Sequence, residues 1–77
     1  MSIRAYVLLR VEAGKLNSVI SAVSQLPEVK EAYPITGDYD AIVSIEVENV
    51  ADIREAVATK IHKIDGVKET STHIAFK

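Results

Sequence analysis

Two short segments of the chain resemble each other: LPEVKEA at residues 26–32 recurs loosely as IDGVKET at residues 64–70. Each segment lies where an apolar pattern of helical spacing is followed by a pattern typical of a strand. The chain therefore divides into two similar halves, each with a strand, a helix and a second strand. Two such halves, each with a right-handed crossover, combine into a four-stranded antiparallel sheet with both helices on one face.

The hydrophobic periodicity predicts the individual elements. Apolar residues alternate through 3–11 and 41–47, as in strands, whereas residues 16–26 carry the apolar stripe of an amphipathic helix. The expected elements are strands over residues 3–11, 29–35, 41–47 and 67–76, and helices over residues 16–26 and 49–64. Pro34 lacks a backbone donor, so its strand is expected to lie at an edge or to end there. This order, β-α-β-β-α-β, predicts a ferredoxin-like α+β plait.

The length of 77 residues indicates a single domain over residues 1–77. A lone core of this size rarely supplies more than about 3–5 kcal/mol of net stability, so we expect help from a second subunit. Hydrophobic residues make up 48% of the chain and aromatic residues only 5%, which predicts a globular fold with an aliphatic core.

Composition and charge exclude several classes of function. The absence of cysteine rules out a disulfide framework, a thiolate metal site and a cysteine nucleophile. The formal net charge is -2 and charges of both signs are mixed, so no basic stripe exists to bind nucleic acid directly. Arg10 and Glu12 interrupt the first apolar segment, which is too short for a signal peptide or a membrane span. We therefore expect a soluble cytoplasmic protein without a metal or cofactor.

One face of the predicted sheet is not covered by helices, yet it is not uniformly polar. Apolar residues occur on both sides of the first and third strands, and the last strand alternates too weakly to assign its two rows to the two faces. An exposed apolar sheet face usually marks an interface, although single exposed apolar residues are common and need no explanation. We expect a sheet-face dimer. Its interface residues would be Tyr6, Leu8, Ile42, Ile74 and Phe76.

The turn between the second and third strands concentrates polar groups in Gly37, Asp38, Tyr39 and Asp40. The simplest interpretation is a structural hairpin turn, because Gly and Asp favour turn conformations. A metal site is weakly supported, because the carboxylates lack a nearby His and the spacing of a calcium loop. The third interpretation is an amino-acid site in which a carboxylate binds the ligand ammonium and backbone N–H groups bind its carboxylate, with Tyr39 against its side chain. The residues alone do not choose between the first and the third.

Three segments in this order resemble a known family: LPEVKEAY at 26–33, TGDYD at 36–40 and GVKETST at 66–72. Together they are similar to the effector-binding domain of the Lrp/AsnC (feast/famine) transcriptional regulators, called the regulation of amino-acid metabolism domain. The resemblance extends over essentially the whole chain. Full-length members begin with a helix-turn-helix domain, whereas the first strand here begins at Ile3, so the chain resembles a stand-alone version of the domain.

The resemblance implies a ligand, partners and a set of site residues. Such domains are plaits that pair through their sheets, often assemble further into tetramers or octamers, and bind amino acids where dimers meet. The site residues that it implies are Gly37, Asp38, Tyr39 and Asp40 of the turn, Thr70, Ser71 and Thr72 of the last strand, and the adjacent His73. It also implies a role in amino-acid-responsive transcription, with a free amino acid as effector and a full-length Lrp/AsnC regulator as a partner.

Functions outside this family remain open. A plait of this size can also be an interaction protein that only oligomerises, or a small enzyme such as a dimeric monooxygenase or an acylphosphatase. The enzyme class is disfavoured, because the sequence contains no evident general base with an orienting partner. An ACT-type domain would bind the same class of ligand and would differ in how its subunits pair. We expect a non-enzymatic amino-acid-binding domain.

Overall fold

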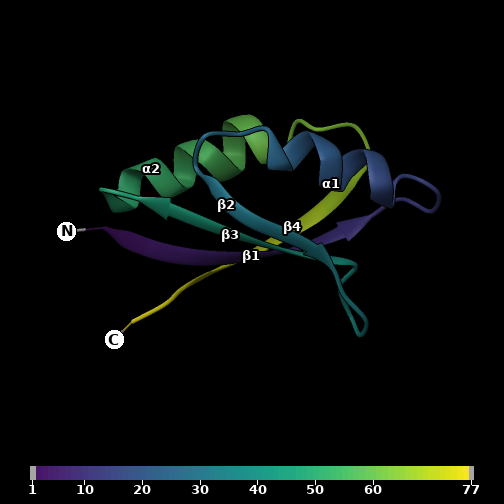
Figure 1. Ribbon diagram of the computed structural model, residues 1–77, viewed down its shortest axis with the longest axis horizontal. Helices are drawn as coiled ribbons and strands as arrows, with labels where there is room; N and C mark the ends of the chain where they lie inside the picture. The colour runs from purple at the N-terminus through teal and green to yellow at the C-terminus, as the bar shows by residue number, and fades with distance from the viewer. Residues whose placement is uncertain (1, 77) are drawn as a thin grey trace.

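The computed structural model describes residues 2–76. Its elements are β1 (Ile3–Val11), α1 (Leu16–Ser24), β2 (Val29–Pro34), β3 (Ala41–Val47), α2 (Val50–Glu55), η1 (Ala56–Ile61) and β4 (Val67–Ile74). Figure 1 shows the helices on one side of the sheet, with the other side left uncovered. The expected ferredoxin-like α+β plait is confirmed.

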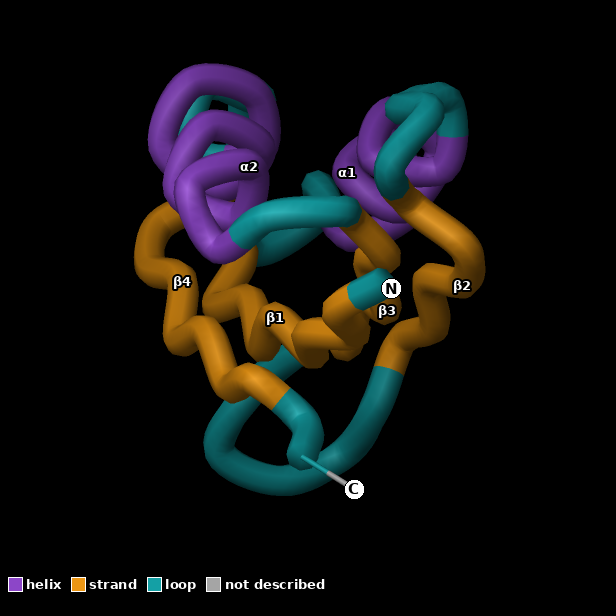
Figure 2. The backbone as a smooth tube through the Cα atoms, turned by 90° about the vertical axis from the view of Figure 1, so that its left-hand side faces the viewer, coloured by secondary structure: helices purple, strands orange, loops and turns teal. Residues whose placement is uncertain are grey.

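The sheet is antiparallel, with the strand order β2-β3-β1-β4, so β2 and β4 form its two edges. Figure 2 shows the two helical segments side by side above the strands. Pro34 ends β2 at an edge, where the missing backbone donor costs little. The backbone N–H of Ile35 donates to the carbonyl of Asp40 at 2.9 Å and closes the loop between β2 and β3.

The hydrophobic core lies between the sheet and the helices. Every buried hydrophobic residue within residues 2–76 is aliphatic, as the composition predicts. The largest fully buried side chains are Val7 and Leu9 of β1, Val43 and Ile45 of β3, Val19 and Val23 of α1, and Ile61 of η1. The alternating rows of β1 and β3 thus supply the floor of the core, and the apolar stripes of the helices supply its roof.

The second helical segment differs from the expected continuous helix over 49–64. The α-helical part ends at Glu55, and the segment continues as a π-helix to Ile61. The backbone N–H of His62 donates to the carbonyl of Val57 at 2.8 Å, the i to i−5 pattern of a π-turn. Apolar residues spaced four apart fit either kind of helix, so the pattern predicts a helix without specifying its type. None of the helices within residues 2–76 has the length and apolar character needed to cross a membrane.

Candidate functional site

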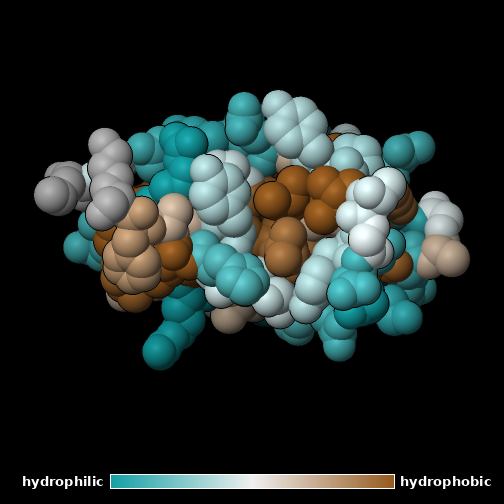
Figure 3. All heavy atoms as spheres, turned by 90° about the horizontal axis from the view of Figure 1, so that it is seen from below, coloured by the Kyte–Doolittle hydropathy of each residue, from teal (hydrophilic) through white to brown (hydrophobic). Residues whose placement is uncertain are grey.

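The side of the sheet away from the helices is here called the open face. The open face consists of Arg4, Tyr6, Leu8 and Arg10 of β1, Glu31 and Tyr33 of β2, Ile42, Ser44 and Glu46 of β3, and Glu69, Ser71 and His73 of β4. Figure 3 shows the molecule from this side, with an apolar area near its centre surrounded by polar side chains. Leu8 and Ile42 are cross-strand partners and half-buried, and Tyr6 and Tyr33 are exposed. Three of the predicted interface residues, Tyr6, Leu8 and Ile42, therefore share this face.

The other two predicted interface residues lie elsewhere, which corrects the prediction that they share the open face. Ile74 is the cross-strand partner of Ala5, so it lies on the helix side and packs against the core. Phe76 lies beyond the end of β4 and is 89% exposed. The sequence did not reveal this, because the rows of the last strand alternate weakly and only pairing with β1 assigns them to a face.

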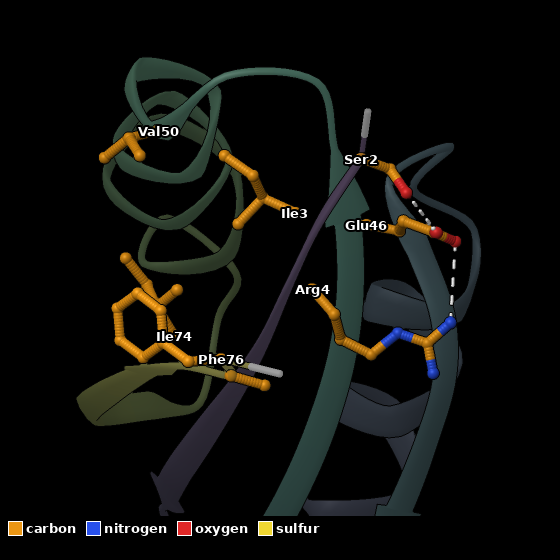
Figure 4. Close-up of a pocket in the computed structure, with 8 residues that line it drawn as sticks. Ser2, Ile3, Arg4, Glu46, Val50, Ile74 and Phe76 are labelled. Atoms are coloured by element: carbon orange, nitrogen blue, oxygen red, sulfur yellow. Dashed lines mark hydrogen bonds and ion pairs between the residues drawn. The ribbon is translucent and has the colours of Figure 1, made fainter.

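Phe76 lines a groove of about 880 Å3 at the end of the sheet where β1 begins. Figure 4 shows the apolar side chains Ile3, Val50 and Ile74 on one side of β1, and Ser2, Arg4 and Glu46 on the other. The polar side chains engage each other: Ser2 Oγ donates to Glu46 Oε2 at 2.8 Å, and Arg4 Nη2 lies 3.5 Å from Glu46 Oε1. The Ser2 hydrogen bond and then the charge of Arg4 lower the pKa of Glu46.

At the opposite end of the sheet, the loop between β2 and β3 is fixed to β1 through Asp40. The backbone N–H of Asp40 donates to the carbonyl of Leu9 at 2.8 Å, and its carboxylate Oδ2 accepts from the backbone N–H of Val11 at 2.8 Å. Gly37 has a φ of +110°, a conformation that side chains rarely adopt, and it is exposed together with Asp38. The loop thus presents Gly37 and Asp38 to solvent while Asp40 anchors it.

Arg10 connects this loop to the last strand. Its Nε lies 2.6 Å from Glu69 Oε1, and its Cζ lies 5.0 Å from the centre of the Tyr39 ring. The pKa of Arg10 is raised, chiefly by the hydrogen bond to Glu69 and to a smaller extent by the nearby charge of Asp38. Sequence reasoning did not identify Arg10 as a site residue. The alternating pattern of residues 3–11 predicts that Arg10 lies on a strand. Only the tertiary structure shows that it lies between Tyr39 and Glu69.

The predicted site residues of β4 lie on both sides of the sheet. Thr70 and Thr72 pair with buried residues of β1 and therefore lie on the helix side of the sheet. Ser71 and His73 lie on the open face, where Ser71 Oγ is 3.0 Å from His73 Nε2. A single pocket within one subunit therefore cannot contain all of these side chains. Within residues 2–76, no cluster of three or more His, Cys, Asp or Glu side chains is arranged to hold a metal ion.

Comparison with known sequences identifies relatives over nearly the whole chain. The sequence model of the Lrp/AsnC ligand binding domain matches residues 4–77. The HTH-type transcriptional regulator FL11 of Pyrococcus furiosus is 37% identical over 76 residues, which are 99% of this chain and 50% of the relative. The regulatory protein AsnC of Haemophilus influenzae is 34% identical over 65 residues, 84% of this chain and 43% of the relative. The chain thus spans about half the length of these relatives, which are transcriptional regulators rather than enzymes.

Solved structures support the same assignment. The crystal structure of FFRP-DM1 superposes with a TM-score of 0.91 at 38% identity, covering 96% of this chain and 99% of that one. A Neisseria meningitidis transcriptional regulator, NMB0573, solved as an L-Met complex, has a TM-score of 0.87 at 17% identity, covering 97% of this chain and 50% of that one. The second likeness shows a shared fold. The family match and these relatives together show that the chain belongs to the Lrp/AsnC ligand-binding domains.

Proposed function

We propose that this chain binds a free amino acid at the end of the sheet where the loop of residues 36–39 meets β1 and β4. The observation that carries the proposal is the position of Arg10, which contacts both Tyr39 of the loop and Glu69 of the last strand. This arrangement places carboxylates, backbone N–H groups, an aromatic ring and a guanidinium in one region of partly exposed residues. Those are the groups that recognise an ammonium and a carboxylate on the same small molecule.

The chemistry assigns a role to each part of the loop. Asp38 or the second carboxylate oxygen of Asp40, Oδ1, would accept hydrogen bonds from the ligand ammonium, and Tyr39 would pack against the ligand side chain. Each charge-assisted hydrogen bond would contribute about 1.5–3 kcal/mol to binding. One regulator of this fold has been solved with L-Met, and we extend that class of ligand, though not its identity, to this chain.

We further propose that two copies associate through the open face. Exposed Tyr6 and Tyr33 and half-buried Leu8 and Ile42 give this face an apolar centre, which is typical of an interface. Polar residues surround this apolar centre, including Arg4, Glu46 and His73. Thr70 and Thr72 lie on the helix side of the sheet, away from the open face. We propose that in the assembly a neighbouring subunit contributes polar groups to the site in their place.

Membership of this family supports a proposed role in transcription. The relatives regulate transcription, and a ligand-binding domain that changes its assembly would transmit the amino-acid level to such a regulator. We propose that the chain acts in amino-acid-responsive transcription in the cytoplasm, in association with a full-length regulator of the same family.

The proposal is tested by a thermal-shift screen of the twenty amino acids, followed by sedimentation of the protein with and without each hit. A ligand that binds the folded assembly adds RT ln(1 + [L]/Kd) to its free energy of unfolding and so raises its melting temperature, and a ligand between subunits also shifts the oligomer size. We expect one or a few amino acids to do both. If all twenty leave a stable oligomer unchanged, the amino-acid proposal is wrong and the chain is better described as an oligomerising interaction domain.

A further inference from the structure

We propose that the Arg10 guanidinium binds the carboxylate of the amino acid and restricts the site to ligands with a free carboxylate. This inference rests on the proposed function and specifies which group of the ligand the site recognises. Arg10 belongs to β1, outside both segments that the sequence suggested for binding. It would be a specificity-determining residue supplied by the centre of the sheet.

The backbone places Arg10 at the middle of the proposed site. Its two chain neighbours, Leu9 and Val11, each hydrogen bond to Asp40 of the loop at 2.8 Å. On the other side of β1, Arg10 is the cross-strand partner of Glu69 in β4. The pairing of β1 with β3 ends one residue earlier, at Leu9 and Ala41, so on that side the two Asp40 hydrogen bonds hold β1 on either side of Arg10. A ligand between the loop and β4 would therefore meet this side chain.

Two contacts position the Arg10 guanidinium, and its Nη atoms remain available as hydrogen bond donors. Glu69 engages Nε, and the Tyr39 ring lies 5.0 Å from Cζ at a distance typical of a cation–π contact. Within residues 2–76 neither Nη atom makes a hydrogen bond, and the side chain is 43% exposed. Arginine presents paired donors in a planar fork that matches a carboxylate. A side chain already ordered by two contacts loses less conformational entropy when it binds.

The charges around Arg10 explain why a carboxylate ligand needs it. Asp38, Asp40 and Glu69 all lie in this region and would repel the carboxylate of an incoming amino acid while attracting its ammonium. Arg10 supplies the opposite charge next to them. The site would thus present acids and a guanidinium side by side, which suits a zwitterion better than an amine or a simple acid.

The test removes the Arg10 guanidinium and the ligand carboxylate separately, as in a double-mutant cycle. The wild type and Arg10→Gln are each titrated with the twenty amino acids and with the primary amide of each, which keeps the ammonium and side chain but lacks the carboxylate. For the amino acids that bind, we expect Arg10→Gln to weaken binding of the acid by about 10-fold to 100-fold and not to weaken binding of the cationic amide, which no longer meets the positive charge of Arg10. Arg10→Lys keeps the charge but lacks the planar pair of donors. We expect its affinity for the acid to lie between those of the wild type and Arg10→Gln.

Arg54→Gln is the control, because Arg54 is an exposed arginine on α2, outside both the proposed site and the open face. It should bind acids and amides like the wild type. If Arg10→Gln and Arg10→Lys, both folded by circular dichroism, keep the wild-type preference for acid over amide, Arg10 does not bind the carboxylate and the proposed function still stands. If the wild type binds none of the twenty amino acids, both proposals are overturned.

Discussion

The carboxylate of Asp40 accepts a hydrogen bond from the backbone N–H of Val11 at 2.8 Å. The same residue uses its own N–H to bind the carbonyl of Leu9, so the loop is attached to β1 on both sides of Arg10. An acid that the sequence suggested for ligand binding therefore also has a structural role. Variants at this position must separate the two.

Asp40→Ala is expected to lower the free energy of unfolding by about 1–3 kcal/mol, because it leaves a partly buried backbone N–H without its acceptor. Asp40→Asn keeps an acceptor oxygen and should lose clearly less. Urea denaturation of both variants measures the difference. Equal losses would show that the hydrogen bond to Val11 is not what Asp40 contributes. If Asp40 also binds the ligand ammonium, Asp40→Asn should remain folded but should bind amino acids more weakly than the wild type does.

Leu8→Glu tests the open face. Leu8 is half-buried opposite Ile42 and away from the core, so the charge should weaken association and leave the fold intact. Sedimentation should show a smaller species, with an unchanged circular dichroism spectrum. Val50→Glu is the control, since Val50 is 58% exposed on α2 and outside the open face. An oligomer that resists Leu8→Glu, or one that Val50→Glu disrupts equally, would contradict assembly through this face.

Gly66 and Gly14 differ in the space around them although both have positive φ, +104° and +85°. A Cβ at Gly66 would lie 2.9 Å from Lys15 Cβ and 3.0 Å from Val19 Cγ2, whereas at Gly14 it would meet nothing within 4 Å. Gly14→Ala should therefore cost only the backbone strain, about 1–2 kcal/mol. Gly66→Ala should cost about 1–3 kcal/mol more, because the core must shift. Chemical denaturation measures both, and similar losses would exclude the steric explanation.

The ion pair between Lys60 of η1 and Glu28 predicts a pH dependence of stability. The hydrogen bond from Lys60 lowers the pKa of Glu28 below its ordinary value of 4.5, against the opposing effect of burial. The folded state thus binds this proton less readily than the unfolded state, so the contribution is complete above about pH 4.5 and is lost as the pH falls through the folded pKa.

Lys60→Met should accordingly lower the free energy of unfolding by about 1 kcal/mol at neutral pH. The difference from the wild type should shrink as the pH falls below about 4.5. Lys63→Met, at an exposed lysine shortly after the same helix, is the control and should change little. Denaturation midpoints across this pH range measure the effect. A difference that stays constant with pH would assign the loss to packing instead of charge.

Particular residues show how far the sequence could be interpreted. The strands of residues 3–11 and 41–47 were predicted with the bounds that the structure has, because their alternation is regular and their inner rows are strongly apolar. The π-helical turn was not predicted, because the spacing of Ile53, Val57 and Ile61 suits two kinds of helix. For the candidate site, the sequence pointed to the loop of Gly37 and Asp38, which is exposed and ordered around Asp40.

The sequence by itself determined the order of the elements, the plait and the inner rows of β1 and β3, because local periodicity records which side chains must leave water. The tertiary structure alone decided that Ile74 faces the helices, that Thr70 and Ser71 lie on opposite sides of the sheet, and that Arg10 lies between Tyr39 and Glu69. These relationships depend on the register between strands that are distant in the chain. A register is set by the packing of the whole sheet, and no local pattern contains it.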